Sequence, residues 1–306
     1  MMTRKLLPLL AIAVAGLTGT AEGVEFVSPA AGTLVKAGTS VTMIIRLSPG
    51  EQATNVGVLT SEGSTTATAG AGGLFEATVR IPQEAVGPDI IAAYAVLAGG
   101  GVSFARLEIV VDAGAIRALI VSARPVLTFA GEIAEVDVRG VFEDNVVRDL
   151  SYAERGTTYT SSDPGVLGSH PSGLIQARGS GTATLTVANG GRSETVSVEV
   201  KIPPGATNGI PVVTPPTDQI VASETVVTLS APASDPNGDP ITYTWEQSDG
   251  RLIVLRNADT AQPLFIAPFV TSEHPMEFTV TVSDSHGATS FPVTVRVIVR
   301  PRAPDA

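Results

Sequence analysis

Apolar residues along most of the chain alternate with polar ones, with a period of two. In one run, Val41, Met43 and Ile45 fall on one face and Thr42 and Arg46 on the other. Such alternation predicts half-buried β-strands, because successive side chains of a strand point to opposite faces. Clusters of Gly, Pro, Ser, Asn and Asp interrupt the runs at roughly ten-residue intervals, and helical patterns are nearly absent. The pattern therefore predicts an all-β protein.

The predicted strands group into three units, each close to the size of an immunoglobulin-like β-sandwich of about 100 residues. The predicted divisions are a first sandwich at 24–112, a second at 113–201, a linker at 202–210, a third sandwich at 211–300 and a tail at 301–306. The linker sequence is rich in Pro and Gly, and the first connection is short. We expect three tandem sandwiches arranged as a rod.

The N-terminal sequence has Arg4 and Lys5, then an apolar run at 6–17, then small residues that suit cleavage. This order predicts a signal peptide over 1–23. The apolar run is too short to cross a bilayer of about 30 Å as a helix. A retained N-terminal anchor is the alternative. The mature chain is expected to lack a transmembrane segment and to be periplasmic, on the cell surface or extracellular.

The composition narrows the range of partners. The 306 residues carry a formal net charge of −11, which argues against nucleic acid as a partner because that needs clustered Lys and Arg. The chain has 0 Cys, so it can form neither a disulfide framework nor a thiolate nucleophile. Each sandwich is therefore expected to depend on its hydrophobic core.

Two long stretches of the second unit resemble a known family. They are "LTFAGEIAEVDVRGVFEDNVVRDLS" and "YTSSDPGVLGSHPSGLIQARGSGTATLTV". On these motifs, residues 114–201 resemble a group 2 bacterial immunoglobulin-like domain of the kind repeated in intimin and invasin adhesins. Tyr159 stands where members often carry tryptophan, and we expect this change to alter core packing but not the fold.

The third unit contains "VVTLSAPASDPNGDPITYTWEQSDG", "PLFIAPF" and "FTVTVSDSHGATS". On these motifs, residues 209–300 resemble PKD domains of the receptor-for-egg-jelly type, although "WEQSDG" replaces the usual "WDFGDG". Residues 24–112, with "VEFVSPAAGTLVKAGTSVTMII" and "GLFEATVRIP", resemble a generic bacterial immunoglobulin-like domain. These resemblances imply spacing, adhesion or attachment to surface or polysaccharide-active proteins, and they imply no catalysis.

Catalytic motifs are missing from the sequence. The 3 histidines, His170, His274 and His286, lie in turn-forming sequences and are expected at the solvated surface. The sequence has neither G-x-S-x-G nor H-E-x-x-H, so no nucleophile or zinc-site motif is recognised. We therefore predict that the protein is not an enzyme and needs no cofactor.

One segment suggests a metal. In "SDPNGDPITYTWEQSDG", Asp235, Asn237 and Asp239 alternate, and such oxygen-bearing side chains can converge on calcium. An EF-hand is excluded because Pro240 replaces the glycine needed at the sixth position. The strand that follows would also point Glu246 away from the loop.

A loop-cluster site is the remaining geometry. The loops at one end of a sandwich lie together, so Asp284 could join Asp235, Asn237 and Asp239 to bind calcium. Residues 202–306 contain 5 Arg and 11 Asp plus Glu, a charge of −6 that favours a cation. Alternatively, Asp, Asn, Gly and Pro are there only because they form turns.

Trp245 and Tyr243 raise the question of sugar stacking. Both share a strand face with Ile241, which predicts core residues rather than an exposed sugar platform. The sequence as a whole predicts a non-catalytic exported protein that serves as an adhesion, spacer or interaction module. The alternative is a carbohydrate-binding or matrix accessory protein whose third sandwich uses calcium. Its partner would be a protein or a polysaccharide of the cell envelope or extracellular matrix.

Overall fold

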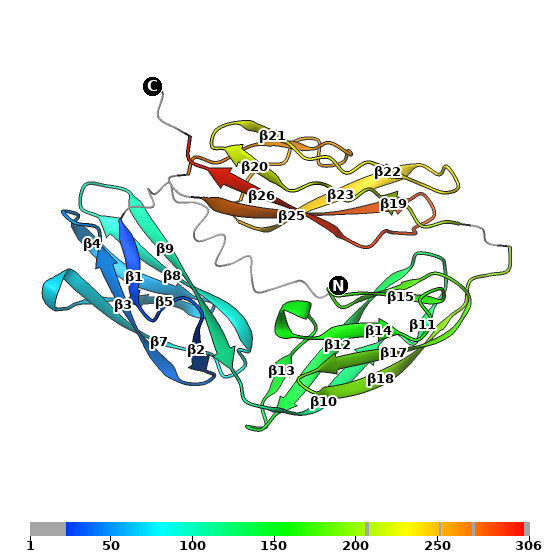
Figure 1. The fold of residues 1–306 in the computed structure, drawn as a ribbon, viewed down its shortest axis with the longest axis horizontal. Coiled ribbons are helices and arrows are strands. Elements are labelled where there is room, and N and C mark those ends of the chain that lie inside the picture. Colours follow the sequence, from blue (N-terminus) through cyan, green and yellow to red (C-terminus); the bar gives the residue numbers. More distant parts are fainter. Residues whose placement is uncertain (1–22, 206–207, 251, 271–272, 303–306) are drawn as a thin grey trace.

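A computed structural model of the chain describes residues 23–205, 208–250, 252–270 and 273–302. Strands dominate these residues, and the short 3-10 turns η1 (Ala71–Gly73) and η2 (Ala153–Arg155) are the helical elements. The predicted all-β class with tandem β-sandwiches is confirmed (Figure 1). The predicted signal peptide lies outside the described residues, apart from Gly23. Within the described part of the chain, no helix has the length and hydropathy needed to cross a membrane.

The first sandwich packs a four-stranded sheet against a five-stranded one. The first sheet has the order β1 (Val24–Ser28), β3 (Ser40–Leu47), β7 (Leu74–Arg80) and β6 (Thr68–Ala69). The second has the order β2 (Thr33–Lys36), β9 (Val102–Asp112), β8 (Gly87–Leu97), β4 (Ala53–Thr60) and β5 (Gly63–Thr66). Met43, Ile45 and Ile109 are among the side chains buried between them.

The second sandwich is built in the same way. One sheet has the order β10 (Ile116–Ala123), β12 (Ile133–Phe142), β16 (Leu174–Ala177) and β15 (Leu167–His170), with β13 (Val147–Asp149) also paired to β12. The other has the order β11 (Val126–Leu127), β18 (Arg192–Val200), β17 (Gly181–Asn189) and β14 (Thr158–Ser161). Tyr159 packs against the core and donates its hydroxyl hydrogen to the Ser151 carbonyl at 2.7 Å.

The third sandwich has one main sheet, of order β20 (Gln219–Ala222), β26 (Val293–Arg300), β25 (His274–Asp284) and β23 (Ile241–Asp249). The opposite layer consists of two short pairs, β21 (Val226–Thr228) with β24 (Leu264–Ile266), and β19 (Val212–Val213) with β22 (Ala233–Ser234). Trp245 is 7% exposed and its indole N–H donates to the Thr260 carbonyl at 3.0 Å. The prediction that Trp245 is a core residue is confirmed.

The two faces of β23 and β25 differ: one is buried in the core and the other points outward. Met276, Phe278, Val280 and Val282 alternate along β25 and are buried in the core. Each such side chain contributes roughly 1.5–3 kcal/mol through burial. The residues between them point away from the core, and on this outward face Thr281 lies directly opposite Thr244 of β23. This outer face is therefore polar.

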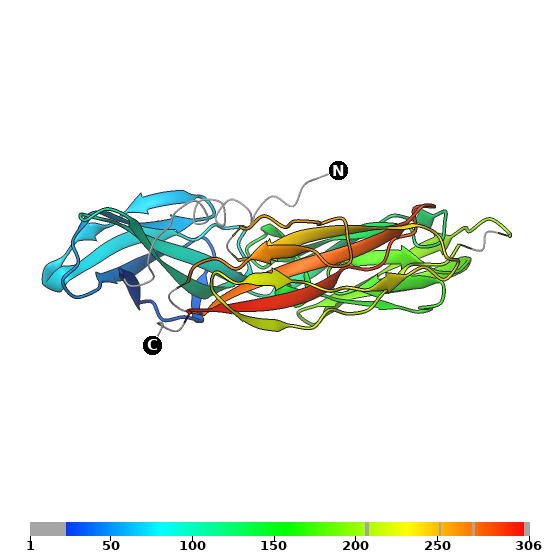
Figure 2. The ribbon, with the colours of Figure 1, turned by 90° about the horizontal axis from the view of Figure 1, so that it is seen from above.

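The predicted rod is wrong, because the chain folds back after the second sandwich. The third sandwich lies alongside the second, and both views show this arrangement (Figures 1 and 2). The Gln176 side chain donates to the Thr289 carbonyl at 2.6 Å, and the Thr289 N–H donates to the Gly131 carbonyl at 3.2 Å. The linker is long enough to reverse the chain, so side-by-side packing replaces end-to-end stacking.

Aromatic contacts reinforce this docking. The ring of Phe291, in the third sandwich, lies with its centroid 5.1 Å from that of His170. The guanidinium of Arg178 lies 5.7 Å from the same Phe291 centroid. The expected solvation of His170 in a surface turn is therefore wrong. His170 ends strand β15 and is half-buried between domains.

A buried arginine braces the connection between the first and second sandwiches. The Arg148 side chain is 0% exposed, and it pairs with Asp144 at 2.7 Å. It also donates to the backbone carbonyl of Gln83 in the first sandwich and lies over the Phe142 ring, 4.7 Å from the centroid. The Arg148 hydrogen bond holds the pKa of Asp144 down, at about 2. The first connection is thus fixed by an ion pair as well as by its short length.

Candidate functional site

Polar side chains gather at the end of the third sandwich where β25 finishes. Asp284 continues the inward-facing alternation two residues beyond Val282, so it is only 7% exposed. Its Oδ1 accepts hydrogen bonds from the backbone N–H groups of His286 and Ala288, at 2.8 and 2.9 Å. Its Oδ2 accepts one from the Asn208 side chain at 2.6 Å. Asp284 therefore holds its own turn and ties the linker to the sandwich.

Three potential ligand groups meet beside this turn. Ligand atoms of Asp239, Asp284 and His286 all lie within 4.8 Å of one another. The Asp239 Oδ2 atom lies 3.2 Å from Nδ1 of His286, whose side chain is 62% exposed. Two of the predicted calcium ligands are thus brought together, with a histidine that the sequence prediction did not include.

The other two predicted ligands, Asp235 and Asn237, accept hydrogen bonds from backbone N–H groups. Oδ1 of Asp235 accepts from the backbone N–H groups of Asn237 and Asp239, at 2.8 and 3.1 Å. Oδ1 of Asn237 accepts from the N–H of Gly209 in the linker. The contacts of Asp235 are the turn-forming role that Asp ordinarily plays, whereas the contact of Asn237 ties this turn to the linker.

Two buried oxygens near the cluster lack a hydrogen-bond partner within the described residues. They are Oδ2 of Asp235 and Oδ1 of Asn208. Both belong to residues bonded to the cluster, since Asp235 contacts Asp239 and Asn208 contacts Asp284. A buried oxygen without a partner costs roughly 1–3 kcal/mol, which a cation at this position would offset. Carboxylate and amide oxygens are the ligands that calcium prefers.

Sequence reasoning missed Asn208 and His286. Asn208 lies in the linker, and nothing in the alternation of β-strands points to a linker residue. His286 follows Asp284 by two positions, and this proximity was the available signal. Glu246 lies within β23 on the exposed outer face, as the alternation of this strand predicts.

The contacts of His170 and His286 do not form a catalytic triad. His286 has two polar neighbours, Ser285 Oγ at 3.5 Å and Asp239 Oδ2 at 3.2 Å, and both face the same nitrogen, Nδ1. A triad requires the hydroxyl and the carboxylate on opposite ring nitrogens. His170 bonds Ser172 through Nδ1 at 2.7 Å, and burial lowers the pKa of His170. Its ring packs on Phe291 from the facing domain.

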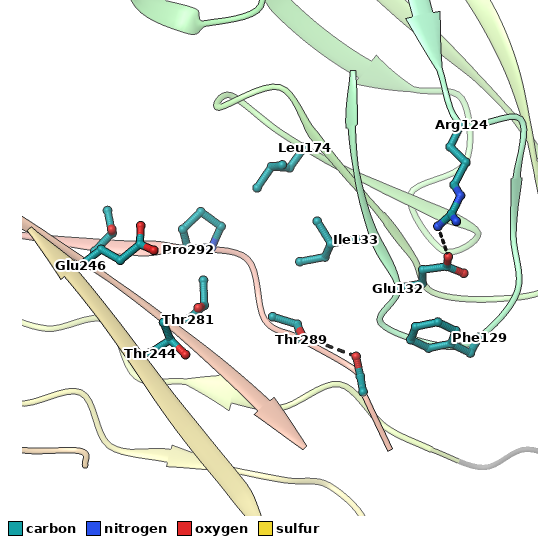
Figure 3. A pocket seen from close by; sticks show the side chains of 12 residues that line it. Arg124, Phe129, Glu132, Ile133, Leu174, Thr244, Glu246, Thr281, Thr289 and Pro292 are labelled. Carbon is teal, nitrogen blue, oxygen red and sulfur yellow. Dashed lines mark hydrogen bonds and ion pairs between the residues drawn. The ribbon is translucent and has the colours of Figure 1, made fainter. Parts of the chain in front are cut away.

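A second candidate site is the cleft between the second and third sandwiches, which has a volume of about 620 Å³ (Figure 3). Clefts of roughly 300–1,000 Å³ are typical of ligand sites. The outer face of β23 and β25 forms one wall, and Ile133, Leu174 and Phe129 of the second sandwich lie on the opposite side. Arg124 and Glu132 form an ion pair at one end. This cleft exists because the chain folds back.

Comparison with known proteins finds a family match in the third sandwich. Residues 216–299 match the family described as "K319L-like, PKD domain". The resemblance of the third unit to a PKD domain is therefore confirmed. The resemblance of the second unit to group 2 domains, and that of the first unit to a generic bacterial domain, stay predictions.

Chitinase A of Pseudoalteromonas piscicida is 29% identical to this chain over 175 residues, which make up 56% of this chain and 21% of that protein. The chain thus corresponds to about a fifth of the curated relative it matches. Among solved structures, the fibronectin(III)-like modules of Clostridium thermocellum CbhA are 14% identical, covering 92% of this chain and 98% of that chain, with a TM-score of 0.24. Extracellular domains 3–5 of Drosophila OTK are 11% identical, covering 94% and 100%, with a TM-score of 0.27.

Proposed function

We propose that this chain is a non-catalytic exported protein that acts at the cell surface or outside the cell as an adhesion, spacer and interaction module. The observation that supports the proposal is the set of contacts that hold the three sandwiches in a fixed arrangement. Arg148 fixes the first connection, while Gln176 and Phe291 fix the third sandwich on the second. Bracing of this kind presents loops and sheet faces in a fixed arrangement, as a recognition protein requires.

A second candidate is recognition of polysaccharide, with calcium assisting in the third sandwich. The cluster of Asp239, Asp284 and His286 supports the calcium part. The similarity to a protein named chitinase A supports the polysaccharide part, although it extends over 21% of that protein. The interdomain cleft supplies a surface for such a ligand.

A retention experiment with the purified mature protein tests both candidates. The protein is applied to immobilised cell-envelope proteins and, separately, to insoluble polysaccharides, and bound protein is quantified by intensity of its stained band. Retention on a defined envelope protein supports adhesion, and selective retention on polysaccharide supports the second candidate. Release of soluble sugars from any of the polysaccharides would contradict a non-catalytic role.

A further inference from the structure

The wall of the interdomain cleft formed by the third sandwich carries a ladder of hydroxyl groups. Thr244 lies directly opposite Thr281, and Glu246 lies directly opposite Thr279, on the outer face of β23 and β25. Directly paired side chains in a sheet are about 5 Å apart, and alternate residues along a strand are about 7 Å apart. The wall is therefore a flat grid of oxygen atoms.

These hydroxyls are available to a ligand. Among the described residues, no side chain or backbone group forms a hydrogen bond with the hydroxyls of Thr244, Thr279 or Thr281. Other hydroxyls of the same domain are engaged, since Thr242 donates to the Ser283 carbonyl at 3.2 Å and Ser283 bonds the Thr289 hydroxyl at 2.8 Å. Of the four threonines that line the cleft, Thr244, Thr279 and Thr281 therefore have hydroxyls without a partner among the described residues, and Thr289 does not.

The opposite wall has apolar side chains and an aromatic ring beside the Arg124–Glu132 ion pair. Ile133 and Leu174 are partly exposed there, and Phe129 is 39% exposed (Figure 3). An aromatic ring offers a flat apolar surface on which the C–H face of a sugar ring can pack. The cleft therefore pairs a hydrogen-bonding wall with an apolar wall, and a pyranose ring likewise has hydroxyls at its edge and C–H groups on its faces.

The charged groups that line the cleft exclude further classes of ligand. The cleft is lined by one guanidinium, that of Arg124, and by the carboxylates of Glu132 and Glu246. Arg124 is already paired with Glu132. A polyanion such as a sulfated or uronate polymer, or a nucleic acid, needs a surplus of cations, and the described residues of this lining supply none. An extended peptide would bind a strand edge through backbone groups, whereas this wall is a sheet face.

We infer that the interdomain cleft binds a segment of a neutral polysaccharide, with the hydroxyls of Thr244, Thr279 and Thr281 bonding the sugar hydroxyls and Phe129 packing against a sugar ring. The inference rests on the polysaccharide-binding form of the proposed function and assigns that binding to a site. It places recognition between the domains, in a cleft lined by Gly287 of the turn that also carries Asp284 and His286.

Titration calorimetry of the full mature protein with cello-hexaose and chito-hexaose tests the inference. The variant T244V/T281V keeps the shape of the wall and removes two hydroxyls, so we expect at least a tenfold loss of affinity. The variant T244S/T281S retains the hydroxyls and should keep affinity within about threefold of wild type. The control T186V/T195V removes a directly opposed pair on the outer face of β17 and β18, and should leave binding unchanged.

Each other outcome overturns the inference in a distinguishable way. If T244V/T281V binds as tightly as wild type, the cleft is not the site, while polysaccharide binding itself stands. If neither hexaose binds and the protein is retained on an envelope protein, the polysaccharide function fails and adhesion stands. Tighter binding of alginate or dextran sulfate than of the neutral sugars would contradict the charge argument. An unchanged Tm shows that each variant is folded.

Discussion

The side-chain amide of Gln176 donates a hydrogen bond to the backbone carbonyl of Thr289 at 2.6 Å, joining the second sandwich to the third. Gln176 is 2% exposed, so this bond is shielded from water. The same Thr289 donates its N–H to the Gly131 carbonyl at 3.2 Å. One residue of the third sandwich therefore has both of its backbone polar groups satisfied by the second.

Substitution Q176A should weaken this docking. The Thr289 carbonyl would lose its partner, at a cost of about 1–3 kcal/mol. We expect a lower Tm of the third sandwich, followed by fluorescence of Trp245, the 1 tryptophan of the chain, and a larger radius of gyration by X-ray scattering. The control is Q219A, which removes a 2.9 Å bond to the Thr228 carbonyl within the third sandwich. Equal radii for the two variants would show that Gln176 does not hold the domains together.

Docking should also depend on pH through His170. Burial lowers the pKa of His170, so the unfolded or undocked state takes up its proton first. The stability contributed by neutral His170 is present above the unfolded value of about 6.5 and is lost as pH falls below it. We expect the Tm difference between wild type and H170Q to change between pH 7 and pH 5. Arg178, the other cation near Phe291, stays charged throughout.

The control for this experiment is H286Q, because the exposed His286 side chain bonds Asp239 and Ser285 of its own sandwich. It should retain the wild-type dependence on pH for docking. If the Tm of H170Q depends on pH in the same way as that of wild type, His170 does not cause the pH dependence of docking.

The Arg148 side chain should stabilise the connection between the first and second sandwiches. R148M keeps the apolar stem but leaves the Gln83 carbonyl and Asp144 without their donor, so we expect a Tm lower by several degrees in calorimetry. The control R139M breaks an exposed pair with Asp137 and should change stability by less than about 0.5 kcal/mol. Similar losses in both variants would indicate that burial of Arg148 has no special role.

The ion pair of Arg148 and Asp144 also predicts a loss of stability at acidic pH. The pKa of Asp144 is lowered to about 2 by the Arg148 hydrogen bond. Its stabilising contribution is therefore present above the unfolded value of about 3.9 and is lost as pH falls toward 2. D144N should show a shallower loss of Tm than wild type between pH 5 and pH 2, measured by circular dichroism. Parallel curves would contradict this assignment.

Much of the fold follows from the sequence because strand alternation is a local pattern. The run around Phe278 predicts a strand, and the placement of Trp245 on the face of Tyr243 predicts its burial. Docking of the third sandwich on the second depends on single side chains such as Gln176 and Phe291, which follow no periodic pattern. Their pairing is set by the direction the chain takes after the linker, and this direction has no sequence signal.

Part of the candidate calcium site could also be predicted from the sequence. Asp284 and Asp239 lie in loops at one end of a sandwich, so general knowledge of the fold was enough to bring them together. Asn208 comes from the linker, and its contact with Asp284 depends on how the linker runs.

Calcium should stabilise the third sandwich. Calcium at 10–100 times its dissociation constant would add about 1–3 kcal/mol to the free energy of unfolding. We expect millimolar calcium to raise the Tm reported by Trp245, chelator to reverse the rise, and D239N to abolish it. The control D259N removes an exposed carboxylate elsewhere in the same sandwich and should preserve the response. A calcium response that survives in D239N would rule out this cluster.

The third sandwich is docked on the second and forms a cleft with it. The chain has 0 Cys, so S122C/T244C can be spin-labelled at one position in each of these domains, and the distance between labels measured by pulsed electron paramagnetic resonance. We expect one narrow distance that broadens in Q176A. A broad distribution in the unsubstituted background, as a flexible linker would give, would contradict the docked arrangement and the cleft with it.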